Sequence, residues 1–100
     1  MQKYGHVYIV EFQDGCKIGQ TTVPLKVRIN PFRQPWCQKI NNVYVSKVPV
    51  DDLSFFEARI IDLLERHYKV LQHRNSEFFP HRSEAIRKVT KKILKWAKYE

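Results

Sequence analysis

Five polar residues, dispersed along the chain, are the candidates for chemistry in this sequence: Tyr8, Lys17, Arg28, Glu57 and Asn75. A phosphoryl group in transfer needs positive charge around its oxygens, and the planar guanidinium of arginine is the side chain best shaped to supply it. A lone carboxylate such as Glu57 is enough for Mg²⁺, which takes one or two carboxylates and keeps several waters. Tyrosine has a pKa of about 10 in isolation, so it can act as a base only beside a cation, for which Lys17 is the candidate. These residue types suit the hydrolysis of a phosphate ester.

Other kinds of site have little support in the sequence. The cysteines and histidines are scattered without the ligand spacing of a zinc site: Cys16, Cys37, His6, His67, His73 and His81. The 3 glycines are too far apart for a phosphate-binding loop, and neither cysteine has an adjacent histidine to activate it as a nucleophile. Two cysteines also make a poor disulfide framework, so we expect a reduced, intracellular protein.

Length and charge narrow the class of protein further. A chain of 100 residues, 43% of them hydrophobic, suits one folded domain over residues 1–100 and excludes a wholly disordered protein. Lys and Arg number 18 against 10 Asp and Glu, and the net charge of +8 favours a polyanionic partner, nucleic acid before an anionic membrane. No apolar run approaches the ~20 residues of a membrane span, and no signal-peptide pattern is visible, so we expect no membrane association.

The first two strands must position Tyr8 and Lys17. His6–Phe12 and Cys16–Thr21 are rich in β-branched and apolar residues, and Asp14–Gly15 between them is a strong hairpin signal. A two-residue turn would pair Phe12 with Lys17 and leave Tyr8 about four residues, ~13 Å, from Lys17 along the strands. This register places three residues on one face of the sheet: Tyr8, Lys17 and Gly19.

The remaining elements alternate between helix and strand. We expect a short helix over Leu25–Asn30 with Thr22 as its cap, then an irregular loop over 31–40 and a strand over Val43–Val48. A long helix should follow from Asp51 or Asp52 to about Tyr68. After it we expect a polar turn over Gln72–Pro80 and a last helix from about Ser83 to Tyr99. This order predicts an α+β domain in which helices flank a small three-stranded antiparallel sheet.

Both long helices are expected to be amphipathic. The buried stripe of the first comprises Leu53, Phe56, Ile60, Leu63, Leu64 and His67, at helical spacing. One side of the last helix is basic and is predicted to contact DNA phosphates: Arg87, Lys88, Lys91, Lys92, Lys95 and Lys98. A merely solvated lysine face and a membrane-surface helix are the alternatives for this side.

The order of several short motifs resembles the GIY-YIG endonuclease superfamily, most closely its short phage, viral and microbial branch. The motifs are Gly5-His6-Val7-Tyr8-Ile9-Val10, Lys17-Ile18-Gly19-Gln20-Thr21, Arg28, Glu57 and the run Asn75–Phe79, and the resemblance covers about residues 5 to 95. It implies metal-dependent hydrolysis of DNA, in which Tyr8 helps to activate water, Arg28 stabilises the phosphate and Glu57 binds Mg²⁺ or Mn²⁺. Lys17 stands where many members carry a second tyrosine.

The sequence departs from that superfamily at two points and leaves alternatives open. The second tyrosine is missing, and Phe32 stands where a histidine would follow Arg28. A DNA-binding module with little or no catalysis is therefore the alternative function, with a partner-binding adaptor third. Glu57 could instead close a capping box with Ser54, and Asn75 could simply form a turn. The preferred prediction is a one-metal endonuclease that acts on DNA, expected to be double-stranded.

Overall fold

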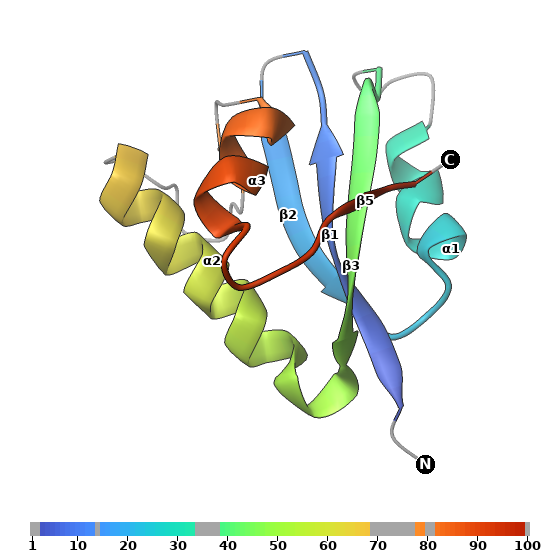
Figure 1. The fold of residues 1–100 in the computed structure, drawn as a ribbon. Coiled ribbons are helices and arrows are strands. Elements are labelled where there is room, and N and C mark those ends of the chain that lie inside the picture. The colour runs from blue at the N-terminus through green and yellow to red at the C-terminus, as the bar shows by residue number, and fades with distance from the viewer. Residues whose placement is uncertain (1–2, 14, 34–38, 69–77, 80–81, 100) are drawn as a thin grey trace.

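An antiparallel sheet with three long strands forms the centre of the structure, a computed structural model that describes residues 3–13, 15–33, 39–68, 78–79 and 82–99. The long strands are β1 (Tyr4–Glu11), β2 (Cys16–Thr21) and β3 (Asn42–Pro49), and two short strands are β4 (Phe78–Phe79) and β5 (Ala97–Lys98). The spatial order is β4-β2-β1-β3-β5 (Figure 1). The predicted α+β class is confirmed, and the two short strands extend the predicted three-stranded sheet at its edges.

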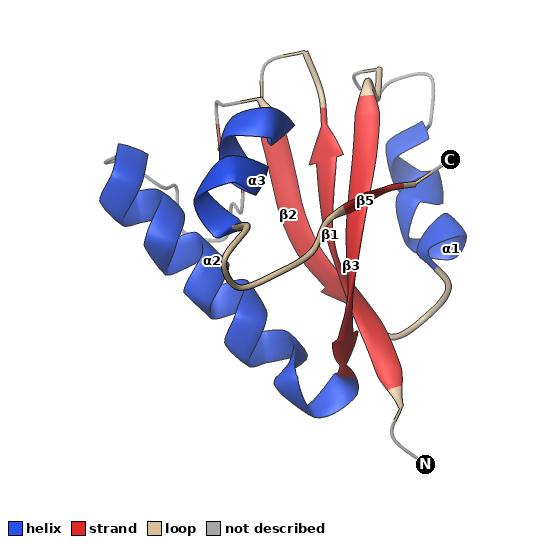
Figure 2. Cartoon of the chain, in the orientation of Figure 1, coloured by secondary structure: helices blue, strands red, loops and turns tan. Residues whose placement is uncertain are grey.

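Helices cover both faces of this sheet (Figure 2). On one side lies α1 (Leu25–Ile29), which continues into a 3-10 turn over Asn30–Arg33. On the other side lie α2 (Leu53–Tyr68), preceded by a 3-10 turn over Val50–Asp52, and α3 (Ser83–Thr90). None of the helices in the described ranges has the length and apolar character to cross a lipid bilayer.

The two faces of β1 bury different side chains because neighbouring residues of a strand point to opposite sides. Val7 and Ile9 belong to the larger hydrophobic cluster, which α2 and α3 cover. Tyr8 and Val10 belong to a second cluster beneath α1. Burial on both faces explains why the sequence of β1 is nearly continuous in apolar residues, and it places Tyr8 on the α1 side.

The register of the hairpin differs from the predicted one by two residues. Glu11 pairs with Cys16 and Tyr8 pairs with Gly19, so residues 12–15 form the connection, which a 2.7 Å hydrogen bond from the Phe12 N–H to the Gly15 carbonyl closes. An even shift keeps Tyr8 and Lys17 on one face, because side chains alternate with a period of two. Their offset falls from four residues to two, about 7 Å, which brings the side chains within reach of a common site.

The short helix α1 lacks the predicted threonine cap. Pro24 occupies its N-cap without a side-chain hydrogen bond, and the Thr21 hydroxyl instead accepts a 3.1 Å hydrogen bond from the Val23 N–H. Pro31 does not end the helical path, since it lies in the 3-10 turn over Asn30–Arg33, whose backbone angles suit the fixed φ of proline. Residues 34–38 of the predicted loop lie outside the described residues.

The predicted last helix over Ser83–Tyr99 is wrong after Thr90, where α3 ends. The Thr90 hydroxyl donates to the Ile86 carbonyl (2.8 Å) and accepts from the Trp96 Nε1–H (2.8 Å). The chain then turns back, β5 pairs with β3, and the Tyr99 N–H donates to the Val43 carbonyl (2.8 Å). Hydrogen bonds to the outer edge of β3 outweigh the helical spacing of the apolar residues, because propensity is weaker than tertiary contacts.

His67 is also placed differently from its predicted position in the buried stripe of α2. Leu53, Ile60 and Leu64 of that stripe are buried, whereas His67 is exposed near the end of the helix. Phe56 packs against the same core, whereas Leu63 of the predicted stripe is only half-buried and lines a groove beside α3. His67 lies in the last turn of α2 and is exposed, so helical periodicity alone placed its side chain too deep.

A carboxylate at the end of β1 joins three elements. Glu11 Oε1 accepts a 2.8 Å hydrogen bond from the Asn42 side chain at the start of β3, and Oε2 accepts a 2.6 Å bond from the Ser83 N–H. Glu11 therefore caps α3, whose N-cap residue Arg82 makes no side-chain cap bond. Burial raises the pKa of the Glu11 carboxyl, but the bonds from Asn42 and Ser83 and the charge of Arg82 outweigh it, so the pKa lies below its usual value of 4.5.

Substitution Glu11→Gln is expected to lower the free energy of unfolding by about 1–2 kcal/mol at neutral pH, because a charged cap becomes a neutral one. A native pKa below the unfolded value means that the contribution is present above pH 4.5 and is lost as pH falls through the native pKa. Urea unfolding of the unmodified protein and of the Glu11→Gln variant should give different free energies of unfolding at neutral pH, and this difference should disappear in acid. Glu84→Gln, which removes an exposed acid from the first turn of α3, is the matched control. An equal loss in the control would contradict the bridging role.

Candidate active site

An open pocket of about 400 Å³ lies between the α1 segment and α2, across β2. Its lining comprises Tyr8, Lys17, Gly19, Gln20, Val23, Val27, Arg28, Pro31 and Glu57. Among the described residues, β4 pairs with Cys16 and Lys17 of β2 and with no later residue of that strand, and α2 presents a side chain around this part of the edge. Four of the five predicted site residues line this one pocket, from β1, β2, α1 and α2.

Tyr8 and Arg28 meet at the floor of the pocket. Tyr8 is only 2% exposed, and its ring lies across Gly19 of the neighbouring strand. A Cβ at Gly19 would collide with the phenol hydroxyl and lie 2.5 Å from Cζ, so glycine is required for this position of the ring. The Arg28 Nε–H donates a 3.4 Å hydrogen bond to the Tyr8 hydroxyl. A cation therefore lies beside the phenol oxygen, and it is Arg28 that makes this bond.

Glu57 enters the pocket from α2 and is half-buried. The capping-box alternative is wrong, because α2 begins at Leu53 and Ser54 already lies inside the helix. Instead, the Ser54 hydroxyl accepts a 3.3 Å hydrogen bond from the Gln20 side chain of β2. Residues three apart share a side of a helix, so this bond fixes the first turn of α2 with Glu57 turned toward the pocket.

Lys17 completes the polar lining, while Asn75 lies outside the described residues. Lys17 is half-buried on β2, opposite Val10 of β1, and projects on the same face as Tyr8. A primary ammonium and a guanidinium thus converge on a space that also holds one carboxylate. This charge distribution suits a phosphate diester and a metal ion together, since cations bind the phosphate oxygens and the carboxylate binds the metal.

The donor set fits one hard divalent cation. Glu57 is the one carboxylate among the described residues that line the pocket, and Mg²⁺ commonly uses a single carboxylate together with waters and phosphate oxygens. The adjacent acids Asp51 and Asp52 are exposed in the 3-10 turn before α2 and do not line the pocket. The residues present therefore match a one-metal site better than a two-metal site.

A cysteine nucleophile is excluded at Cys16. This thiol is buried, and burial raises its pKa to about 12, with Glu11 adding to the rise. Since the thiolate is the reactive form, burial makes Cys16 a poor nucleophile. Cys37 lies outside the described residues.

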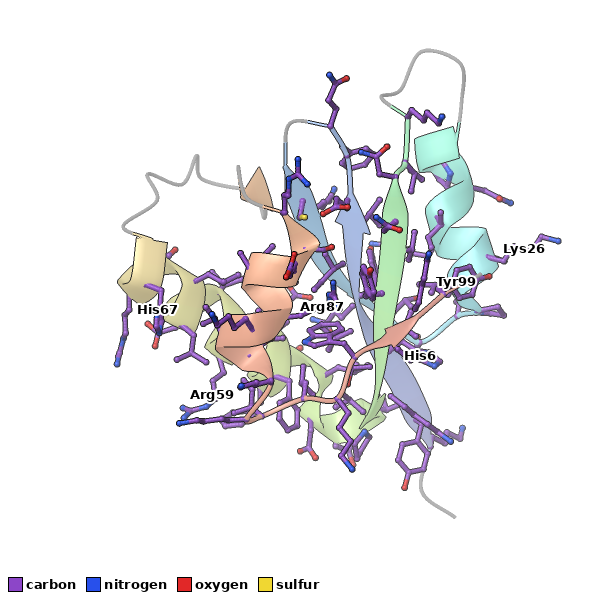
Figure 3. The ribbon with its side chains drawn as sticks, turned by 45° about the horizontal axis from the view of Figure 1, so that its top comes forward. His6, Lys26, Arg59, His67, Arg87 and Tyr99 are labelled. Carbon is purple, nitrogen blue, oxygen red and sulfur yellow. The ribbon has the colours of Figure 1, made fainter. Side chains whose placement is uncertain are left out.

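The six basic residues predicted to share a helix side do not form one surface, because α3 ends at Thr90. The Arg87 guanidinium lies over the Tyr44 ring, 3.9 Å from its centroid, and is half-buried between α3 and the sheet (Figure 3). Lys95 lines a different cavity beside His6, and Lys98 lies in β5. Lys88, Lys91 and Lys92 remain together beside α2.

Four lining residues were missed by the sequence interpretation: Gln20, Val23, Val27 and Pro31. Val23 and Val27 are 47% and 58% exposed, which is unusual for large apolar side chains at a pocket rim. Their four-residue spacing around Pro24 is the available signal, because it puts them on one side of a turn that leads into α1. The pocket thus combines exposed apolar side chains with polar and charged ones.

Comparison with protein families supplies an independent result. The sequence model of the T5orf172 domain matches residues 5–94, a span that includes every described pocket residue. No curated protein and no solved structure gives a significant match. The T5orf172 domain is phage-associated and related to GIY-YIG-like and HNH-like nucleases. Because the match covers most of the chain, the protein belongs to the T5orf172 domain family.

Proposed function

We propose that this protein is a nuclease that hydrolyses DNA phosphodiester bonds with one divalent metal ion, Mg²⁺ or Mn²⁺, at the pocket between α1 and α2. The observation that carries the proposal is the convergence of Tyr8, Lys17, Arg28 and Glu57 on one open space. Membership of the T5orf172 family supports a nuclease-like or DNA-binding role. The GIY-YIG type of the nuclease rests on the motif resemblance.

Arg28 and Lys17 would bind the scissile phosphate. A guanidinium presents several N–H donors in one plane, and an ammonium adds a second positive charge that can follow the phosphate as its geometry changes. Preorganised cations stabilise the charge that develops on the oxygens in the transition state more than that of the ground state. Arg28 can serve in this way while its Nε–H remains bonded to Tyr8.

Tyr8 would help to activate the attacking water by orienting it at the phenol oxygen. The hydrogen bond from Arg28 holds the phenol oxygen in the pocket, so the hydroxyl could form a hydrogen bond with a water beside the phosphate. The close fit of the ring over Gly19 limits its rotation, which reduces the entropy lost when the reactants are aligned.

Glu57 would hold the metal ion through its carboxylate. A bound divalent ion supplies Lewis-acid stabilisation of the phosphate charge. The bond between Ser54 and Gln20 holds the first turn of α2 against β2, and this limits the freedom of Glu57 relative to the cations. The apolar rim made by Val23 and Val27 reduces the water around these charges, which strengthens their interaction with the phosphate.

Removal of metal is expected to separate cleavage from binding. Supercoiled plasmid incubated with Mg²⁺ or Mn²⁺ should become nicked or linear, whereas the same reaction with a chelator should leave it intact. DNA binding, measured by anisotropy in the chelator, should persist because it depends on the basic residues. Binding without cleavage in either metal would identify the protein as a DNA-binding module on this fold.

A further inference from the structure

A second basic surface lies on the other side of α2, in a groove between α2 and the end of α3. The groove has a volume of about 620 Å³ and is lined by Arg59, Leu63, His67, Lys88, Val89, Lys91, Lys92 and Ile93. Arg59 and His67 come from α2, Lys88 from α3, and Lys91 and Lys92 from the turn that ends α3. Figure 3 shows Arg59 and His67 on the helical side of the molecule, away from Lys26 on α1.

This groove is distinct from the candidate active site. Arg59 follows Glu57 by two residues, a rotation of about 200° around a helix, so the two side chains leave α2 in nearly opposite directions. The described lining residues of the two cavities do not overlap. The width of α2, about 10–12 Å with its side chains, therefore separates them.

The charge of the groove has one sign. No acidic residue lines it in the described part of the chain, whereas four Lys and Arg side chains do. The acid Asp62 of α2 is engaged with Arg66 at 3.2 Å, an i,i+4 pair on an exposed side of the helix. Like charges held together without a compensating acid repel one another, and a polyanion that enters the groove relieves this repulsion.

The apolar residues of the groove do not suit a docked protein helix. The large apolar side chains that are exposed in the described residues are Tyr4, Val23, Val27 and Phe55, and none lies in the groove. Val89 and Ile93 instead pack against the main hydrophobic cluster. The three apolar lining residues, Leu63, Val89 and Ile93, are half-buried, whereas the four Lys and Arg side chains of the groove are exposed. A ligand that enters the groove therefore meets cationic groups before it meets apolar anchors of the kind that an amphipathic helix uses.

We propose that the groove between α2 and α3 binds the phosphate backbone of duplex DNA, as a second contact surface that operates whether or not the pocket at Glu57 cleaves. Backbone contacts of this kind carry no sequence information and serve to hold and orient the duplex. The contributing residues are Arg59, Lys88, Lys91 and Lys92, with His67 as a further hydrogen-bonding group. Of the six basic residues predicted to share one side of the last helix, Lys88, Lys91 and Lys92 belong to this surface, and Arg59 joins them from α2.

The test compares two triple variants that lose the same charge. The groove variant is Arg59→Gln, Lys91→Gln and Lys92→Gln, and the control is Lys26→Gln, Lys39→Gln and Lys47→Gln; all six side chains are exposed, so neither variant should disturb the core. Anisotropy of a labelled DNA duplex, in a chelator and over a series of salt concentrations, gives affinity and its salt dependence. Each lost phosphate contact should reduce the steepness of the slope of log affinity against log salt by about 0.9. The slope of the groove variant should therefore be less steep by about 2–3, and that of the control should change much less.

An equal change in both variants, or none in the groove variant, would overturn the proposal. So would effective competition by poly-glutamate at equal charge, because it would assign the groove to an acidic polypeptide. Failure of the proposed function has a different result. If the protein does not cleave DNA but the groove variant alone loses DNA binding, the groove proposal is supported and the nuclease proposal is not. A protein that cleaves while both variants bind DNA equally well leaves only the proposed function standing.

Discussion

Glu57→Gln is expected to abolish DNA cleavage while leaving the fold and DNA binding intact. The substitution keeps the shape of the side chain but removes the one carboxylate found in the described lining of the pocket. A bound metal contributes several kcal/mol of charge stabilisation in the transition state, so the rate should fall at least about 10³-fold. Plasmid nicking in Mg²⁺, with binding measured in parallel, checks the result.

The same helix provides a control for this substitution. Glu65→Gln removes a carboxylate of α2 that does not line the pocket, with the same change in net charge. Its activity should match that of the unmodified protein. A folded Glu57→Gln protein that cleaves at the normal rate would remove Glu57 from the metal site. Reduced thermal stability as its sole effect would indicate a structural role for this carboxylate.

Arg28→Ala is expected to have the second largest effect, a loss of about 10²–10³-fold in kcat, typical of the removal of one transition-state donor. The change removes a cation from the pocket and also the 3.4 Å hydrogen bond to the Tyr8 hydroxyl. Arg28→Lys should recover only part of the rate, because an ammonium cannot bond both the phenol and the phosphate in the fixed geometry of a guanidinium. Single-turnover cleavage with saturating protein measures the chemical step.

Lys26→Ala is the matched control on α1, since Lys26 is an exposed cation two residues away that does not line the pocket. It should cleave normally, apart from a small change in affinity. If Arg28→Ala affected only the affinity and its salt dependence, Arg28 would be a ground-state phosphate contact. A rate equal to that of the Lys26 variant would exclude Arg28 from the site.

The hairpin shows how local signals can predict a face of the sheet without predicting its register. Strand alternation placed Tyr8 and Lys17 on one face, and the structure agrees. The pairing itself is shifted by two residues, because the connection over residues 12–15 is longer than the predicted turn. The alternation of side chains cannot reveal a shift by two residues, since such a shift leaves each side chain on the same face. The register decides the distance between Tyr8 and Lys17, and that distance came only from the folded chain.

The end of the chain shows the opposite outcome. Apolar residues over 83–99 recur at helical spacing, yet the helix ends at Thr90 and β5 joins the sheet beside β3. The gain from pairing with β3 and from the contact of Trp96 with Thr90 depends on residues far away in sequence. No local pattern contains that information. The same holds for Glu11, whose cap on α3 joins residues 72 positions apart.

Residue types and their spacing were enough to predict the α+β class, the three long strands and most of the buried side of α2. The order of the motifs, through their resemblance to the GIY-YIG superfamily, predicted the four residues that meet at the pocket: Tyr8, Lys17, Arg28 and Glu57. These depend on local periodicity and on residue types in order along the chain. Four features are seen only in the folded chain: the Arg28–Tyr8 hydrogen bond, the Glu11 cap, the end of α3 and the basic groove between α2 and α3. Each of these depends on contacts between distant segments, whose energies decide among arrangements that local propensities leave nearly equal.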